Sequence, residues 1–204
     1  MAAMPECHPV PIADFVVMWT VMMAAMMLPA IVPVVLAFAT FSRGRQGSPL
    51  ATSVGFVTGY LVVWGALALP ARALIVAGQW LAASVPWTTP RASGVVLLAC
   101  GLYQLTPLKD SCLRHCRSPH LFLGHHWRDG VGGSLVLGGH HGLYCAGCCA
   151  SLMLVLLVVG VMNLAWMVGV SALVLIEKAV PGGLWIGRGA GAWLCAVGFV
   201  RLLT

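Results

Sequence analysis

The stretch GHHGLYCAGCCASLM, residues 139–153, lies near the start of an uncharged segment that runs from Ser134 to Ile176. This segment is long enough to cross a bilayer about twice, because one helical crossing takes about 20 apolar residues. In a helix, residues that are four apart share one face. If the stretch is helical, one face carries His141, Cys145, Cys149 and Met153, with Cys148 beside them.

This grouping of side chains suits a metal site. Thiolates and thioethers select Cu(I), zinc or iron–sulfur clusters, and imidazole binds several of the same metals. The simpler interpretation is that buried Cys and Met are small apolar packing residues. For any one of these residues packing is the better interpretation, but for the grouping we favour a metal or redox role.

The overall composition indicates a polytopic helical membrane protein. Hydrophobic residues make up 60% of the 204-residue chain, charged residues make up 8%, and the mean hydropathy is +0.96. Soluble proteins carry about 25% charged residues. The first apolar run is too long for a signal peptide, so we expect none to be cleaved. The net charge of +6 is spread thinly, which argues against nucleic acid as a partner.

Hydropathy predicts an all-α transmembrane bundle of about six spans that forms one domain, residues 1–204. A polar lead, residues 1–13, precedes the first span, and residues 73–90 are interpreted as a helix continuation or an interfacial segment. Residues 109–133 are expected to form a Cys/His-rich loop. The predicted spans cover residues 15–41, 50–71, a third that begins at Arg91, two that divide the uncharged segment at 160–163, and 184–203.

The positive-inside rule orients these spans. With six spans, one side of the membrane carries Arg43, Arg45, Lys109, Arg114, Arg117, Arg128, Lys178 and Arg188, and the other carries Arg72, Arg91 and Arg201. The first set is therefore expected in the cytoplasm and the N-terminus outside, in a multi-pass membrane protein. Cytoplasmic thiols stay reduced, which favours metal binding over a structural disulfide.

The first apolar run contains a second group of soft ligands. One row of methionines is spaced by four residues and a pair lies alongside it: Met18, Met22 and Met26, with Met23 and Met27. Methionine is a common packing residue in apolar helices, so packing and a copper-facing stripe both remain open. Pro29 and Pro33 are expected to kink this helix.

The predicted loop contains a third group. Cys112, His115 and Cys116 lie within one or two helical turns, and His120, His125 and His126 follow. Their spacing is not that of a strict zinc finger, so a second ligand cluster is indicated only by composition. Met4, Cys7 and His8 in the lead are interpreted as a metal-capture arm or as a tail without function. Glu177 is expected at the interface, as a buried partner of Lys109, or as a hard ligand.

Several motifs together resemble one family. They are Met18-Trp19, Met26–Pro29, Tyr103–Lys109, Cys112 and Cys116, Gly142–Cys149, and Glu177-Lys178. The chain resembles the bacterial family of predicted metal-binding integral membrane proteins, domain of unknown function 2182, from Asp14 to about Lys178. At Ala150 such members often carry Trp, which alters packing beside the cluster. The resemblance implies a membrane fold and metal binding.

We therefore expect a membrane protein that binds a soft metal for delivery or transport, with copper first and zinc, iron or haem as alternatives. The inner site is predicted at His141, Cys145, Cys148 and Cys149, with Met153 nearby. The methionine stripe would form a thioether path, and Cys112, His115 and Cys116 would receive or release metal at the cytoplasmic face. Thioethers hold Cu(I) more weakly than thiolates, and no phosphate-binding glycine motif indicates ATP use.

Two other functions remain open. Cys145 and Cys148 have the C-x-x-C spacing of a thiol–disulfide oxidoreductase, although no thioredoxin-like pattern accompanies them. The chain could also be a non-catalytic subunit of a larger membrane complex that binds metal or haem. We favour a role that is not enzymatic. The expected partners are the lipid bilayer and a metallochaperone or subunits of a membrane complex.

Overall fold

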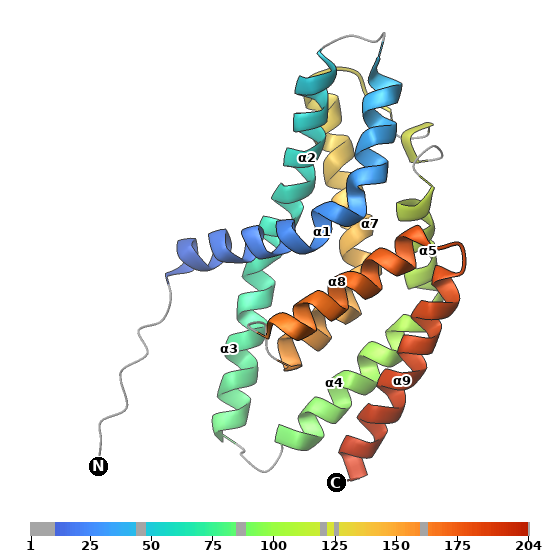
Figure 1. The fold of residues 1–204 in the computed structure, drawn as a ribbon. Coiled ribbons are helices and arrows are strands. Elements are labelled where there is room, and N and C mark those ends of the chain that lie inside the picture. Colours follow the sequence, from blue (N-terminus) through green and yellow to red (C-terminus); the bar gives the residue numbers. More distant parts are fainter. Residues whose placement is uncertain are drawn as a thin grey trace.

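The computed structural model describes residues 11–43, 48–84, 89–118, 122–124, 127–159 and 163–203, and the regular structure in these ranges is helical. The helices are α1 (Ile12–Ser42), α2 (Pro49–Ala66), α3 (Ala68–Ser84), α4 (Thr89–Gln104), α5 (Pro107–Arg117), α7 (Gly130–Val159), α8 (Leu164–Ala179) and α9 (Gly183–Leu203) (Figure 1). The all-α fold class predicted from the sequence is confirmed.

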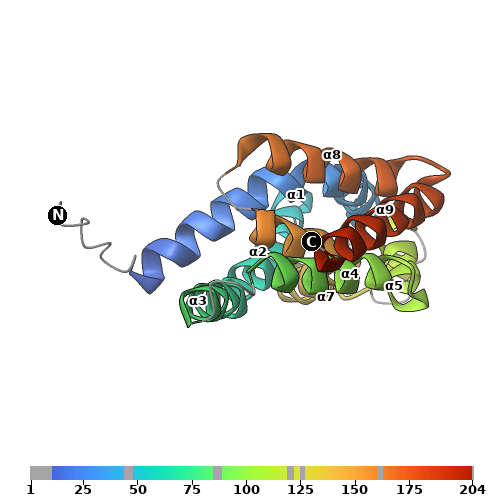
Figure 2. The ribbon, with the colours of Figure 1, turned by 90° about the horizontal axis from the view of Figure 1, so that it is seen from below.

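Helix α7 lies at the centre of the packing and contacts α2, α4, α5 and α8. Its N-terminal part runs beside α2, whereas α4 and α9 form a second close pair (Figure 1). Helix α8 packs against α1, α7 and α9 and covers one side of the molecule, with α3 and α4 on the other side (Figure 2). Residues from α1, α2, α5, α7 and α8 therefore meet around the middle of α7.

Glycines allow α2 and α7 to come close together. A Cβ atom on Gly59 would overlap the carbonyl oxygen of Leu135, and a Cβ atom on Gly138 would overlap that of Phe56. Close backbone approach at small residues is the usual way in which apolar helices pack in membranes. Gly59 and Gly138 therefore mark the place where α2 and α7 meet most closely.

Helix α1 changes direction partway along its length, as Figure 1 shows. It contains the two predicted kink residues, Pro29 and Pro33, which lack the N–H needed for the helical hydrogen bond. The two halves bury different side chains. Trp19 and Met23 enter the core around the α7 cysteines, whereas Phe38 enters a separate aromatic core.

Four described helical stretches are long and apolar enough to cross a membrane: Ile12–Ser42, Pro49–Trp80, Gly130–Leu157 and Gly183–Leu203. The second joins α2 to α3, so residues 73–84 continue the preceding helix, one of the two alternatives expected. Helices α4 and α8 occupy the other predicted spans, and each has 16 residues. A count of six spans and an outward N-terminus stay predictions.

Part of the predicted loop at 109–133 is helical, because residues 107–117 form α5. Thr106 caps this helix, since its side chain accepts a hydrogen bond from the Lys109 N–H, and Pro107 occupies the first turn, where its missing N–H costs nothing. Leu113 and Cys116 face the core, whereas Ser111 and Arg114 are exposed. The polar composition hid a short amphipathic helix.

Candidate metal centre

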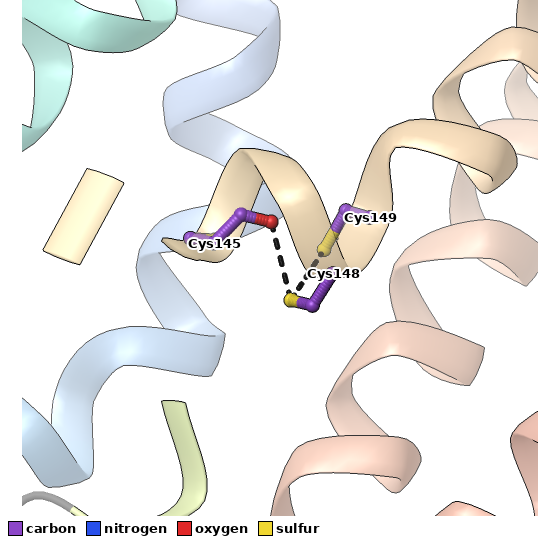
Figure 3. A group of neighbouring side chains, drawn as sticks. All are labelled: Cys145, Cys148 and Cys149. Atoms are coloured by element: carbon purple, nitrogen blue, oxygen red, sulfur yellow. Dashed lines mark hydrogen bonds between the residues drawn. The ribbon is translucent and has the colours of Figure 1, made fainter. Parts of the chain in front are cut away.

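Three thiols of α7 form the centre of the site. Figure 3 shows Cys145, Cys148 and Cys149 on adjacent turns, and their sulfur atoms all lie within 4.8 Å of one another. The Sγ atoms of Cys148 and Cys149 are 3.5 Å apart, and all three side chains are buried. Two thiolates bound to one ion at about 2.3 Å lie up to about 4.6 Å apart, so the 3.5 Å separation of Cys148 and Cys149 fits a shared metal ion.

A fourth thiol reaches the site from α5. The Sγ atom of Cys116 lies 3.8 Å from that of Cys148, and the Cys116 side chain is buried. From the sequence, Cys116 is predicted in a separate group near the cytoplasmic face, because residue spacing does not show how α5 docks on α7. We call Cys116, Cys145, Cys148 and Cys149 the thiol cluster.

Cys145 is the member of the thiol cluster with two polar partners from other helices. The Tyr60 hydroxyl on α2 lies 3.2 Å from its sulfur. The Lys178 ammonium on α8 donates a hydrogen bond to the same sulfur at 3.0 Å. From the sequence, Lys178 is counted only among the cations that orient the spans and in a family motif, and this contact is not predicted. The signal available was its place at the end of a long uncharged segment, where a lysine needs a partner.

A buried ion pair joins α5 to α8 beside the thiol cluster. The Lys109 ammonium donates to both carboxylate oxygens of Glu177 at 2.8 Å, and the two side chains are 2% and 3% exposed. Of the three roles considered for Glu177, the structure shows the buried partner of Lys109. Cys116 lies on the same helix as Lys109, and Lys178 is the residue after Glu177 on α8. The Lys109–Glu177 ion pair therefore helps to fix the positions of Cys116 and Lys178 relative to α7.

Further polar contacts hold the same two helices. Arg117 donates hydrogen bonds to the carbonyl oxygens of Val180 and Pro181, at 2.6 and 3.0 Å, just beyond the C-terminus of α8. Arg188 on α9 forms a 2.8 Å ion pair with Asp110 on α5. Helix α5 is therefore held near both of its ends by α8 and α9, while its apolar face carries Cys116 to α7.

His141 lies outside the group of converging sulfur atoms. Its ring is buried and packs against Phe56, Tyr60 and Phe122, with ring centroids 5.3 to 6.2 Å away. Its Nδ1 atom has no hydrogen-bond partner among the described residues. The predicted His141 ligand therefore lies on the same helix as the thiols, in an aromatic pocket one turn before Cys145.

The predicted methionine stripe divides into an inner and an outer part. Met23, Met26 and Met27 are buried and belong to the same core as the thiol cluster, as does Met153 of α7. Met22 is partly buried against that core, whereas the Met18 side chain is 42% exposed. The stripe thus leads from the surface of α1 into the core that contains the thiols.

Cys112 and His115 lie on the more exposed side of α5. The Cys112 sulfur rests against Gly147 of α7, where a Cβ atom would be only 2.9 Å from it. Partial burial raises the pKa of the Cys112 thiol above its usual value. His115 stacks on Tyr144 at a centroid distance of 4.3 Å, and its Nδ1 lies 2.9 Å from the Ser111 carbonyl oxygen.

Six predicted soft ligands fall outside the described residues: Met4, Cys7, His8, His120, His125 and His126.

Among known proteins, residues 16–201 match the family described as PpoB2: Copper chaperone. No curated protein and no solved structure matches the chain. The matched range contains all four members of the thiol cluster together with Lys178 and the Lys109–Glu177 pair.

Proposed function

Because the chain belongs to the PpoB2 copper chaperone family, we propose that it binds Cu(I) through the thiol cluster and transfers it to or from a partner. The observation that carries this proposal is the convergence of four buried thiols from two helices. Three sulfur atoms lie within 4.8 Å, and the fourth lies 3.8 Å from one of them. Cu(I) is the soft ion for which thiolates are preferred ligands.

Core packing alone does not account for this arrangement. A buried Cys used as a small apolar residue needs only shape complementarity. Here the sulfur atoms contact one another, and one of them also accepts a hydrogen bond from a lysine. Converging sulfur atoms fit ligands of one soft ion, and the lysine favours the thiolate form in which cysteine binds metal.

The methionines and α5 supply two routes to the thiol cluster. Met18 is exposed and Met23, Met26, Met27 and Met153 share the buried core, so copper could pass along weakly binding thioethers before thiolates hold it. On the other side, Cys112 and His115 would exchange copper with a carrier. Thiolates bind Cu(I) more firmly than thioethers, so the thiol cluster would be the resting position of the ion.

The proposed location is a membrane, with the chain as one integral domain. Four described stretches are suitable spans, and large apolar side chains on their outer faces are exposed, including Val17, Leu36 and Trp185. Lipid would cover such a surface. By the positive-inside rule α5 would face the cytoplasm of a bacterial cell, where a metallochaperone or a membrane-complex subunit could reach it.

Burial argues against the oxidoreductase alternative. Thiol–disulfide exchange needs a thiolate that a substrate disulfide can reach, and all four thiols of the cluster are buried. Cys112, which is partly exposed, is better placed for thiol–disulfide exchange than the four buried thiols. Counting reduced thiols before and after incubation with an oxidised dithiol would reveal any cycling.

The test is copper content after purification in detergent under reducing conditions with Cu(I) supplied. We expect about one copper per wild-type chain and its loss in a Cys145/Cys148/Cys149→Ser variant. Cys100→Ser is the matched control, because Cys100 is buried on α4 in a separate core. An absence of copper from the wild type, or equal copper in the triple variant, would contradict the proposal.

A further inference from the structure

The ammonium of Lys178 contacts a sulfur atom where a partly buried lysine would ordinarily face a carboxylate. It lies 3.0 Å from the Cys145 sulfur, to which it donates a hydrogen bond. Its neighbour Glu177 directs both carboxylate oxygens to Lys109. Among the described residues, no carboxylate lies within ion-pair distance of Lys178.

Lys178 is partly buried, and a cation that is partly removed from water is stabilised by a compensating negative charge. A copper-loaded thiol cluster supplies that charge. When two thiols bind Cu(I) as thiolates, two Cu–S bonds form, two protons leave, and the complex carries one net negative charge. One ammonium in contact with one of those sulfur atoms makes the whole site neutral.

We propose that Lys178 is the counter-ion of the copper-loaded cluster, which holds a monovalent soft ion between two thiolates, one of them Cys145. This inference rests on the proposed function and adds the ion's charge, the number of sulfur ligands and a residue that determines affinity. The remaining thiols of the cluster lie close enough to accept the ion during transfer.

The surrounding helices hold Lys178 in this position. Glu177 is anchored by the buried ion pair with Lys109, and Arg117 binds the carbonyl groups that follow α8. Gly187 of α9 leaves room for the ion pair, because a Cβ atom there would lie 2.8 Å from a Glu177 carboxylate oxygen. Lys178, the next residue on α8, is thereby directed to Cys145.

The experiment measures Cu(I) affinity of the full chain in detergent by competition with a chromogenic Cu(I) chelator. Lys178→Met should weaken binding about a hundredfold, as expected for removal of one partner of a partly buried charge pair. Lys178→Arg keeps the charge and should stay within about tenfold of the wild type. Arg201→Met, which removes an exposed cation from α9, should leave affinity unchanged.

A folded Lys178→Met protein with wild-type affinity would overturn the inference and leave the proposed function standing. If the wild type itself binds no Cu(I), the proposed function fails. X-ray absorption at the copper edge measures the number of sulfur atoms bound to copper in the loaded wild type. This second test does not depend on the folding of any variant. Two sulfur neighbours are expected, and three or four would contradict the charge balance.

Discussion

At the scale of single residues, Cys145 differs from the other three thiols in its surroundings. A hydroxyl and an ammonium approach its sulfur from two other helices, whereas Cys148 and Cys149 contact mainly sulfur and backbone. Hydrogen bonds from outside a metal site orient the ligand and tune its affinity. Cys145 is therefore the ligand whose loss, or whose partners' loss, should affect copper binding most.

Tyr60→Phe tests one of these partners. The change removes the hydroxyl group and keeps the ring that packs against Trp64 and His141. A hydrogen bond to a charged group is worth about 1.5–3 kcal/mol, so Cu(I) affinity should fall roughly tenfold or more in the chelator competition. Unchanged affinity would show that the hydroxyl does not stabilise the bound thiolate.

Gly147→Ala tests the contact between Cys112 and α7. The added Cβ atom would lie 2.9 Å from the Cys112 sulfur and must displace it. Copper content should be retained, because the thiol cluster is not touched, while the rate of copper loss to a chelator should change several-fold. Gly189→Ala is the control, since its Cβ atom would meet nothing within 4 Å. An identical rate in both variants would contradict a role for Cys112 in transfer.

Residue spacing predicted part of this site. The i, i+3 and i+4 positions of Cys145, Cys148 and Cys149 place the thiols on one face once α7 is helical, and the structure brings their sulfur atoms together. Spacing could not predict that Cys116 joins them or that Lys178 reaches Cys145. Both contacts depend on how α5 and α8 dock, which is a tertiary property.

At the scale of elements, α5 is the helix that local sequence described least well. It has 11 residues, is amphipathic, packs its apolar face on α7 and makes polar contacts with α8 and α9. Hydropathy identified the long apolar helices because each buries or exposes apolar residues over many turns. It overlooked α5 because a short helix with alternating polar and apolar faces has the composition of a loop.

Glu177→Gln tests the polar attachment of α5. The change leaves the Lys109 charge buried without an anion, which should lower the free energy of unfolding by about 3–5 kcal/mol. Thermal unfolding in detergent measures this, and a Lys109→Met/Glu177→Leu pair should recover much of the loss. Arg188→Ala is the comparison, because that side chain is 43% exposed and its ion pair should contribute less than about 1 kcal/mol.

At the scale of the whole molecule, the helices α2 and α7 form one close pair, α4 and α9 form another, and α7 also contacts α4. Helix α2 packs on its N-terminal part, and α4 with α9 forms the second pair (Figure 1). The thiol cluster lies where these parts meet α5 and α8, so its geometry depends on both. The helical class and the four long apolar stretches follow from composition. The arrangement of the helices depends on close contacts at glycines, and the hydrophobic periodicity of the sequence does not show which glycines make them.

Gly59→Val tests the α2–α7 contact. Its Cβ atom would overlap the Leu135 carbonyl oxygen, so the helices must separate, and overpacking of this kind costs about 1–3 kcal/mol or more. Folded yield and the unfolding temperature should fall, and copper content should fall with them. Gly169→Val on α8, where a Cβ atom meets nothing within 4 Å, should behave like the wild type.

The thiol cluster draws its sulfur atoms from two helices of very different length, since Cys116 belongs to α5 and the others to α7. An ion shared between Cys116 and an α7 thiol would have to lose one sulfur ligand whenever α5 swings away. Local opening of α5 and metal occupancy would then be thermodynamically linked. Amide hydrogen exchange in α5 should slow when Cu(I) is added, and should not slow in a Cys116→Ser variant. The closed or open state of α5 would then depend on whether copper is bound.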